Sequence, residues 1–453
     1  MKLEGKSLKG DFFKFILPSI TAQWVFALYT MVDGIFVARG VSEIALTAVN
    51  ISMPYIMALY AVSILFAVGT STIVAIMLGE QRVQKANQVF SQNICLLVLF
   101  SVVITLLVLL NLKPIALFLG ATDVNIEYVL DYLGSIAPFS GLFILSYSFE
   151  TLIKTDGYPK MATFIVTAGS LINVILDYLM VMKLHMGIRG AAIATGISHV
   201  ILIALYLAHF CGKKGIIKFT KFRLNLPLIW RQVKNGIPSC ITELSPGLII
   251  FLFNQAILYY LNEDALVSYT IISYVNSLAV MTMVGIAQGY QPLISYYYGK
   301  GRMDQCGRLF RYGIGAVIVS SAAFTFVCMG GTETIVRLFL SSADSRLVPY
   351  SVQVFRIFAA SFLIAGYNVV IGAYFTAVER PVAATVISLA RGMVMLSLSL
   401  LVMTMAFGGA GIWWSPLVSE ALSLILTLGF LIPYLRTRPF SQNKQPAIYG
   451  STP

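Results

Sequence analysis

An internal repeat restricts the fold of this chain more than any other feature. When the sequence is shifted by 220 positions, five residues of the first half meet an identical residue of the second without a gap: Pro18 and Pro238, Gly69 and Gly289, Gly79 and Gly299, Arg82 and Arg302, Phe90 and Phe310. Such a period describes two copies of one half-protein. Positions at which the copies differ are therefore candidates for function.

Both halves have the composition of membrane lobes. The 453 residues are 58% hydrophobic and only 11% charged, with a mean hydropathy of +0.84, which excludes the soluble globular class. A hydrocarbon core of about 30 Å needs about 20 apolar residues. Twelve runs are long enough, at roughly 14–38, 45–77, 91–112, 126–152, 161–183, 189–209, 234–260, 265–297, 311–331, 347–377, 383–406 and 411–435.

We therefore predict an all-α integral membrane protein of twelve transmembrane helices in two six-helix lobes. Because six is even, both copies enter the bilayer from one side, and a parallel pseudo-two-fold repeat relates them. The predicted parts are an N-terminal lobe (1–210), a cytoplasmic amphipathic linker (211–233), a C-terminal lobe (234–436) and a disordered cytoplasmic tail (437–453). The basic, partly apolar linker suits the membrane surface. A connector between moving lobes is favoured over a separate lipid-regulatory site.

The distribution of Lys and Arg predicts the orientation. Loops on one side hold 23 of these residues and loops on the other side hold six. The positive-inside rule then places both termini in the cytoplasm. The net charge of +12 is explained by contact with anionic lipid headgroups, so membrane lipid is an expected partner and nucleic acid is not.

Several functional classes lack their motifs. The sequence contains no G-x-x-x-x-G-K-[ST] phosphate loop, which excludes an ATP motor within the chain. Its five cysteines form no C-x-x-C pair and no Cys/His metal spacing. The first span is too long for a removable signal peptide. We expect no enzymatic activity and no cofactor.

Polar side chains inside the first-half spans lie at one depth. Asp33, Asp177 and Thr195 each lie about five or six residues from the outer end of their spans, roughly 8–9 Å below the outer surface. Asn173 precedes Asp177 by four residues and shares its helix face. Ionisable groups in hydrocarbon are costly and indicate function. Two carboxylates, an amide oxygen and a hydroxyl form a set that suits Na⁺ or a shared proton.

The repeat strengthens this prediction. Taken alone, Asn173 or Thr195 is better explained as helix-packing contact. The shift by 220 places Phe253 opposite Asp33, so the acidic set occurs in one lobe only. His199 lies one turn beyond Thr195 and is a possible member of a proton route.

A second group of charges approaches the midplane of the C-terminal lobe: Glu243, Arg356, Arg391 and Glu420. Two positive and two negative side chains neutralise one another, which is how a membrane interior tolerates charge. A structural ion-pair network is the favoured interpretation. The alternative is that one glutamate contacts cationic substrate.

Four stretches together resemble the multidrug and toxic compound extrusion (MATE) transporters. They are "LPSITAQWVFALYTMVDGIFVARGVSEIALTAVNISMPY", "DGYPKMA", "INVILDYLMV" and "GIRGAAIATGIS". The resemblance covers residues 10–436 and is greatest to the bacterial branch with its cation site in the N-terminal lobe. It implies a V-shaped fold of two six-helix lobes around a central cavity. We expect the protein to be a monomer in the bacterial plasma membrane.

The resemblance also implies roles for individual residues. Asp33 would be the acid of the first helix, Pro18 the point where that helix bends, and Asn173, Asp177 and Thr195 the other cation-site members, with Tyr132 nearby. Another bacterial branch relies on acids in helices 7, 8 and 10. Of that set this chain supplies only Glu243, which lies five residues after Pro238.

The predicted function is multidrug efflux by alternating access, in which amphipathic, mostly cationic compounds leave in exchange for H⁺ or Na⁺. Three alternatives stay open. A lipid-linked saccharide flippase of the same superfamily would need a cationic cavity. A major-facilitator transporter would carry a G-x-x-x-D-R loop after span 2, where this chain reads "LGEQRVQKANQVF". A channel or receptor would lack coupled flux.

Overall fold

The computed structural model describes residues 7–340 and 347–437, and this part of the chain is helical without a strand. The first half contains α1 (Leu8–Gly40), α2 (Glu43–Gly79), α3 (Val83–Leu110), α4 (Leu112–Phe118), α5 (Ile126–Ile136), η1 (Ala137–Phe139), α6 (Ser140–Asp156), α7 (Pro159–Asp177), η2 (Tyr178–Lys183) and α8 (Gly187–Cys211). The second half contains α9 (Leu226–Tyr260), α10 (Glu263–Gly299), α11 (Met303–Gly330), α12 (Thr332–Phe339), α13 (Leu347–Ala359), α14 (Phe362–Ala377), α15 (Pro381–Leu389), η4 (Ala390–Val394), α16 (Met395–Phe407) and α17 (Gly409–Thr437).

Twelve helical segments in the described residues are long and apolar enough to cross a membrane, which confirms the predicted class and number of spans. The fourth and tenth are each built from two helices, α5 with α6 and α13 with α14. The short helices α4 and α12, which the hydropathy pattern did not predict, begin at Leu112 and Thr332, again 220 positions apart. The predicted tail lies outside the described residues, apart from Thr437, which ends α17.

Two spans contain π-helical segments. η2 follows α7 directly after Asp177, and η4 lies between α15 and α16. Both therefore occur in the fifth span of their half, but η4 begins nine residues after Pro381 whereas η2 begins 19 residues after Pro159. π-Helical turns carry an extra residue and occur often at functional positions.

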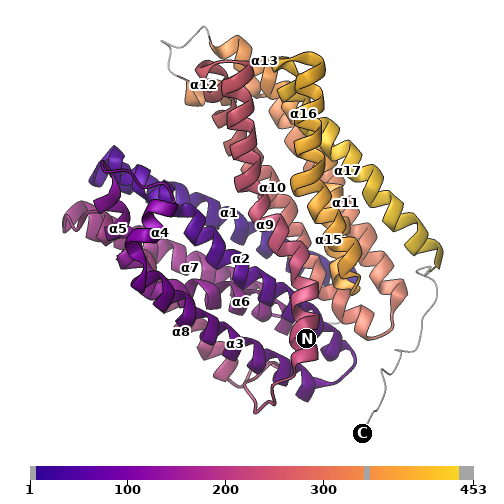
Figure 1. Cartoon of the computed structure of the whole chain (residues 1–453). Coiled ribbons are helices and arrows are strands. Elements are labelled where there is room, and N and C mark those ends of the chain that lie inside the picture. The colour runs from indigo at the N-terminus through magenta and orange to yellow at the C-terminus, as the bar shows by residue number, and fades with distance from the viewer. Residues whose placement is uncertain (1–6, 341–346, 438–453) are drawn as a thin grey trace. The chain divides into compact units, whose positions relative to one another are not determined.

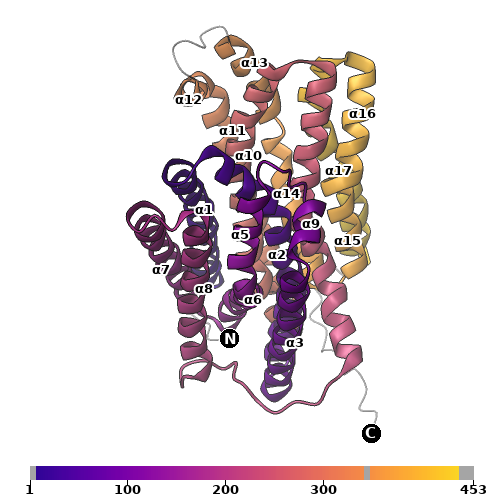
Figure 2. The same ribbon diagram turned by 60° about the vertical axis from the view of Figure 1, so that its left-hand side comes forward.

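The chain forms two compact units whose boundaries run through α1 and α9. Of the described residues, 21–243 belong to the first unit, and 7–20 and 244–437 belong to the second. In the first unit α2 packs against α3 and α6, and α6 packs against α8 (Figure 1). In the second unit α10 packs against α11 and α14, and α17 against α14 and α16 (Figure 2). The predicted lobes assigned α1 and α9 whole, so this division differs from them.

Glycines of the repeat explain why these two helices divide. Gly285 and Gly289 of α10 face Ile20 and Ile16 of α1 so closely that an added Cβ would meet backbone atoms. In the first unit, Gly69 of α2 meets the backbone of α9 in the same way. Small residues allow such close helix contact in membranes. The match of Gly69 with Gly289 in the sequence is therefore a match of packing contacts.

The segment between the halves is shorter than the predicted linker 211–233. Cys211 ends α8 and α9 begins at Leu226, so only residues 212–225 are non-helical. The remaining predicted linker residues form the first two turns of α9 and belong to the first unit.

Candidate functional site

Three helices of the first unit carry the predicted cation-site residues. Asp33 lies on α1, Asn173 and Asp177 lie on α7, and Thr195 lies on α8. Two contacts hold α1 against the α7–η2 junction. The Phe36 ring lies 6.3 Å from the Tyr178 ring, and a Cβ at Gly40 would collide with the Val181 side chain. This packing places Asp33 beside the end of α7.

Asn173 and Thr195 are in direct contact. The Asn173 Nδ2 group donates a hydrogen bond to Thr195 Oγ1 at 3.3 Å, and the Thr195 hydroxyl donates to the Ala191 carbonyl at 3.0 Å. The Thr195 oxygen therefore keeps a lone pair available. The Asn173 Oδ1 atom is buried and has no hydrogen-bond donor among the described residues.

Asp33 and Asp177 face each other within hydrogen-bonding reach. Asp177 is fully buried, and neither of its oxygens has a donor in the described residues, nor has the buried Asp33 Oδ1. Ionised carboxylates contain acceptors only, so a hydrogen bond between them requires a proton on one. With Asn173 Oδ1, four buried oxygens therefore need a cation or a proton.

The structure adds two tyrosines to this site that sequence reasoning missed. They are Tyr29 and Tyr60; Tyr132, which the resemblance named, lies within electrostatic range of Asp33, Tyr29 and Asp177, and its role at the site stays a prediction. Tyr29 lies near both aspartates and hydrogen-bonds to Tyr60 of α2. Tyr29 precedes Asp33 by four residues on α1, so helical spacing was the signal that could have identified it. Nothing in the local sequence marked Tyr60.

His199 is buried and contacts the backbone of one predicted cation-site residue. Its ring stacks on Phe143 with centroids 4.0 Å apart, and its Nδ1 atom lies 2.9 Å from the Thr195 carbonyl oxygen. Because a carbonyl only accepts, Nδ1 carries the hydrogen of this bond. The contact ties His199 to the backbone of the residue that binds Asn173.

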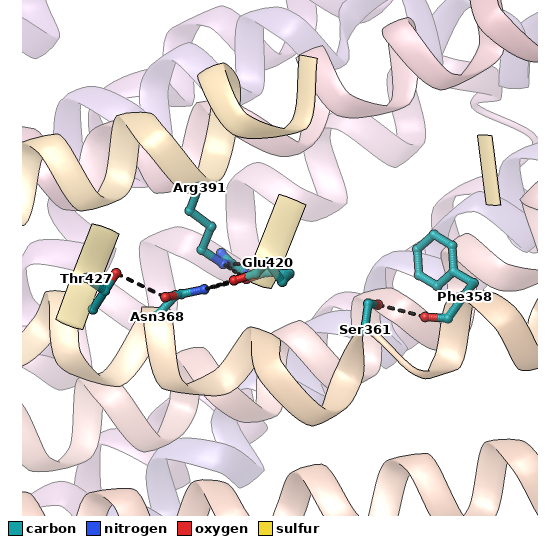
Figure 3. Close-up of polar contacts among 6 residues, drawn as sticks. All are labelled: Phe358, Ser361, Asn368, Arg391, Glu420 and Thr427. Atoms are coloured by element: carbon teal, nitrogen blue, oxygen red, sulfur yellow. Dashed lines mark hydrogen bonds and ion pairs between the residues drawn. The ribbon is translucent and has the colours of Figure 1, made fainter. Parts of the chain in front are cut away.

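The second unit contains a different polar cluster, shown in Figure 3. Arg391 Nε donates to both carboxylate oxygens of Glu420, at 3.0 and 3.3 Å. Asn368 Nδ2 donates to Glu420 Oε2 at 2.8 Å, and Thr427 Oγ1 donates to Asn368 Oδ1 at 3.0 Å. Arg391 lies on η4, so the π-helical turn positions the guanidinium toward α17.

Only part of the predicted four-residue charge group forms. Arg356 is exposed on α13 and makes no ion pair within the described residues. Glu243 is exposed on α9, belongs to the first unit, and lies within electrostatic range of Tyr60. The expectation that all four balance one another is therefore wrong for Arg356 and Glu243, because of the four only Arg391 and Glu420 form an ion pair within the described residues. Two uncharged residues that the sequence analysis did not predict, Asn368 and Thr427, complete the cluster.

Pro18 lies inside α1, which runs unbroken from Leu8 to Gly40. Proline removes one backbone hydrogen bond and weakens the helix locally. The boundary between the two compact units falls two residues later, after Ile20. The predicted role of Pro18 as the bend in this helix stays a prediction.

No group of three or more His, Cys, Asp and Glu side chains in the described ranges has the arrangement of a metal site. The oxygen cluster at Asp33 and Asp177 therefore differs from a resident transition-metal centre. Its mixture of carboxylate, amide and hydroxyl oxygens fits a hard monovalent cation or a proton in transit.

These features define a polytopic membrane transporter made from a duplicated six-helix unit. The sequence profile of the MatE family matches residues 18–179 and again 238–407, so the chain belongs to the MatE family. The two matches begin at Pro18 and Pro238, the first pair of the sequence repeat.

Relatives align along almost the whole chain. Multidrug export protein MepA of Staphylococcus haemolyticus (strain JCSC1435) is 26% identical, with 96% of this chain and 95% of that protein covered. Multidrug export protein MepA of Staphylococcus aureus (strain NCTC 8325 / PS 47) is 25% identical, with 93% and 92% covered.

Solved structures show the same fold. An outward-facing multidrug resistance MATE family transporter of the MOP superfamily superimposes with a TM-score of 0.88 at 20% identity, covering 96% of each chain. MATE in the straight conformation also has a TM-score of 0.88, at 19% identity, with 96% of this chain and 97% of that chain covered.

Proposed function

We propose that this protein exports amphipathic cationic compounds by alternating access, in exchange for H⁺ or Na⁺ bound at Asp33 and Asp177. The single observation that supports ion coupling is the set of four buried oxygens without donors on Asp33, Asn173 and Asp177. The names of its relatives, multidrug export proteins, support drug efflux and do not favour saccharide flipping.

The geometry suggests how the ion is coupled to movement. Asp33 and Asp177 lie on different helices and repel each other when both are ionised. A bound cation removes this repulsion and draws α1 toward the α7–η2 junction. Coupling follows when the two access states differ in their affinity for the cation. The membrane potential supplies about 2.3 kcal/mol per charge per 100 mV.

H⁺ and Na⁺ would use the same oxygens differently. A single proton shared by Asp33 and Asp177 supplies the one donor that the pair lacks. Na⁺ would instead be held by carboxylate oxygens with Asn173 Oδ1 and the Thr195 hydroxyl. Dependence on Asn173 and Thr195 therefore separates the two ions.

Glu243 is the candidate contact for cationic substrate. It is exposed within a membrane span, and the described residues supply it with no ion-pair partner. An unpaired acid at this depth attracts a positive group. We expect Glu243→Gln to weaken binding of cationic compounds more than binding of neutral ones.

Efflux of a fluorescent organic cation from proteoliposomes tests the proposal. We expect a pH gradient or a Na⁺ gradient alone to drive efflux by the wild type. Asp177→Asn should reduce efflux to the level of protein-free liposomes while leaving expression and thermal stability intact. Glu333→Gln is the matched control, because it removes an exposed carboxylate of the second unit, where a surface ion pair contributes little to stability. Gradient-driven efflux by Asp177→Asn at the wild-type rate would overturn the proposal.

A further inference from the structure

The non-helical segment 212–225 carries a strip of positive charge without a single acidic residue. Five basic side chains are exposed along it: Lys213, Lys214, Lys218, Lys221 and Arg223. Exposed apolar side chains lie among and just after them: Phe219, Leu224, Leu226 and Trp230. We call this surface the linker strip. Its composition combines attraction to anions with affinity for an apolar boundary.

The first unit holds the backbone of the linker strip in place. Asp156, fully buried at the end of α6, accepts the N–H groups of Ile216 at 2.9 Å and Ile217 at 3.0 Å. The same carboxylate lies 2.9 Å from His209 Nε2. Tyr158 donates its hydroxyl hydrogen to the Lys214 carbonyl at 2.8 Å. One buried carboxylate thus ties the start of the segment to the end of α8.

Side chains of α3 continue this attachment along the segment. Asn87 Oδ1 accepts the Lys218 N–H at 3.1 Å, and Ser91 Oγ accepts the Thr220 N–H at 2.8 Å. Gln92 Oε1 accepts the Asn225 N–H at 3.1 Å. Asn87 and Ser91 lie one turn apart on α3, and Gln92 directly follows Ser91. The segment is therefore anchored at intervals through its backbone, and its basic side chains are left outward.

The exposure of successive residues along the segment agrees with these backbone hydrogen bonds. Gly215 and Ile217 are buried, whereas Lys218 is exposed. A Cβ at Gly215 would collide with Asp156, so a side chain at this position would displace the segment. A flexible connector would not need such close packing. The backbone hydrogen bonds and the close packing at Gly215 therefore fix the direction in which the basic side chains point.

We propose that the linker strip is a docking site for anionic phospholipid headgroups of the adjacent leaflet. Both ends of the segment enter membrane-spanning helices, α8 and α9, so the strip lies at a bilayer surface. Charge complementarity selects anionic over zwitterionic headgroups. Trp230 and Leu226 lie where an aromatic and an apolar side chain reach the boundary between headgroups and acyl chains. This site is separate from ion coupling and needs no substrate.

Quenching of Trp230 by brominated lipids measures this binding. The full-length protein in nanodiscs is compared with Trp230→Phe, and the difference isolates the Trp230 signal. Brominated phosphatidylglycerol should quench Trp230 more strongly than brominated phosphatidylcholine at equal mole fraction. Lys218→Gln with Lys221→Gln should lower the relative association of phosphatidylglycerol by about fivefold or more. Their backbone anchors stay in place because only side chains change.

The matched control neutralises Arg302 and Arg308, two exposed basic residues of the second unit. Arg302→Gln with Arg308→Gln should leave the lipid preference at Trp230 unchanged. Equal quenching of the wild type by the two lipids would overturn the proposal, as would an equal loss in the control. If a variant is recovered poorly, the amount of phosphatidylglycerol that co-purifies with wild type and control decides instead. The measurement needs no ion gradient, so it stands or fails independently of antiport.

Discussion

Asp33 of the first unit and Phe253 of the second occupy equivalent positions of the repeat, yet their surroundings are opposite. Asp33 faces Asp177 with oxygens that lack donors. Phe253 is buried and stacks on Tyr269, with ring centroids 4.9 Å apart and planes at 9°. One helix position thus contributes to the proposed ion site in one unit and to an apolar core in the other.

The polar clusters of the two units differ in the same sense. In the second unit, the Glu420 carboxylate is matched by Arg391 and Asn368. In the first unit, Asp177 has no matching donor in the described chain. A buried polar network in which every group has a hydrogen-bond partner stabilises a packed structure. Buried acceptors without donors are instead available to a cation or proton that binds reversibly. This difference supports the proposal that ion coupling takes place in the first unit, and it fits a structural role for the cluster of the second unit.

The largest expected effect concerns the aspartate pair. Asp33→Asn and Asp177→Asn should each reduce gradient-driven efflux by about tenfold or more, and the double variant should lose little beyond either single one, because residues acting as a unit are not additive. Initial efflux rates in proteoliposomes measure this. Additive losses would show that the two carboxylates act separately.

The next prediction concerns the ion pair of the second unit and its contribution to the free energy of unfolding. Arg391→Met leaves Glu420 without its counter-charge and should lower the free energy of unfolding by about 3 kcal/mol. Thermal unfolding in detergent checks this. The double variant Arg391→Met with Glu420→Met should recover most of the loss and still export, since it removes both charges. Failure of a well-folded double variant to transport would assign the pair to substrate binding and remove the contrast between the units.

The amide of the ion site should have a smaller effect. Asn173→Ala removes the neutral Oδ1 atom and the hydrogen bond that Nδ2 donates to Thr195, a loss of about 1 kcal/mol. The Na⁺ concentration for half-maximal efflux should then rise about fivefold, if Na⁺ is the coupling ion. An unchanged Na⁺ dependence with intact proton-driven efflux would identify H⁺ instead.

The smallest effect is expected at Arg356. Its side chain is exposed and makes no ion pair in the part of the chain that the structure describes, so Arg356→Ala should change stability by less than about 0.5 kcal/mol. Purified yield and melting temperature provide the measurement. If Arg356→Ala lowered the melting temperature as much as Arg391→Met does, Arg356 would belong to the charge network after all.

The sequence predicted which acids of the first unit lie together better than it predicted the charge network, for a physical reason. Asp33 and Asp177 were identified by depth, which follows from counting residues along apolar helices. Partners in the second unit depend on helix rotation, and counting does not determine rotation. Arg356 and Arg391 therefore looked equivalent, although only Arg391 reaches Glu420. Asn368 was missed because no acidic residue lies one helical turn from it, as Asp177 does from Asn173.

The sequence by itself determined the membrane class, the twelve spans, the duplication and the restriction of the acidic set to one copy, because hydropathy and identity are properties of single positions. Only the tertiary structure decided that α1 and α9 divide between the compact units and that Tyr29 and Tyr60 join the aspartates. It also decided that a buried Asp156 holds the linker strip. These features depend on which helix faces meet, and distant residues set those contacts jointly.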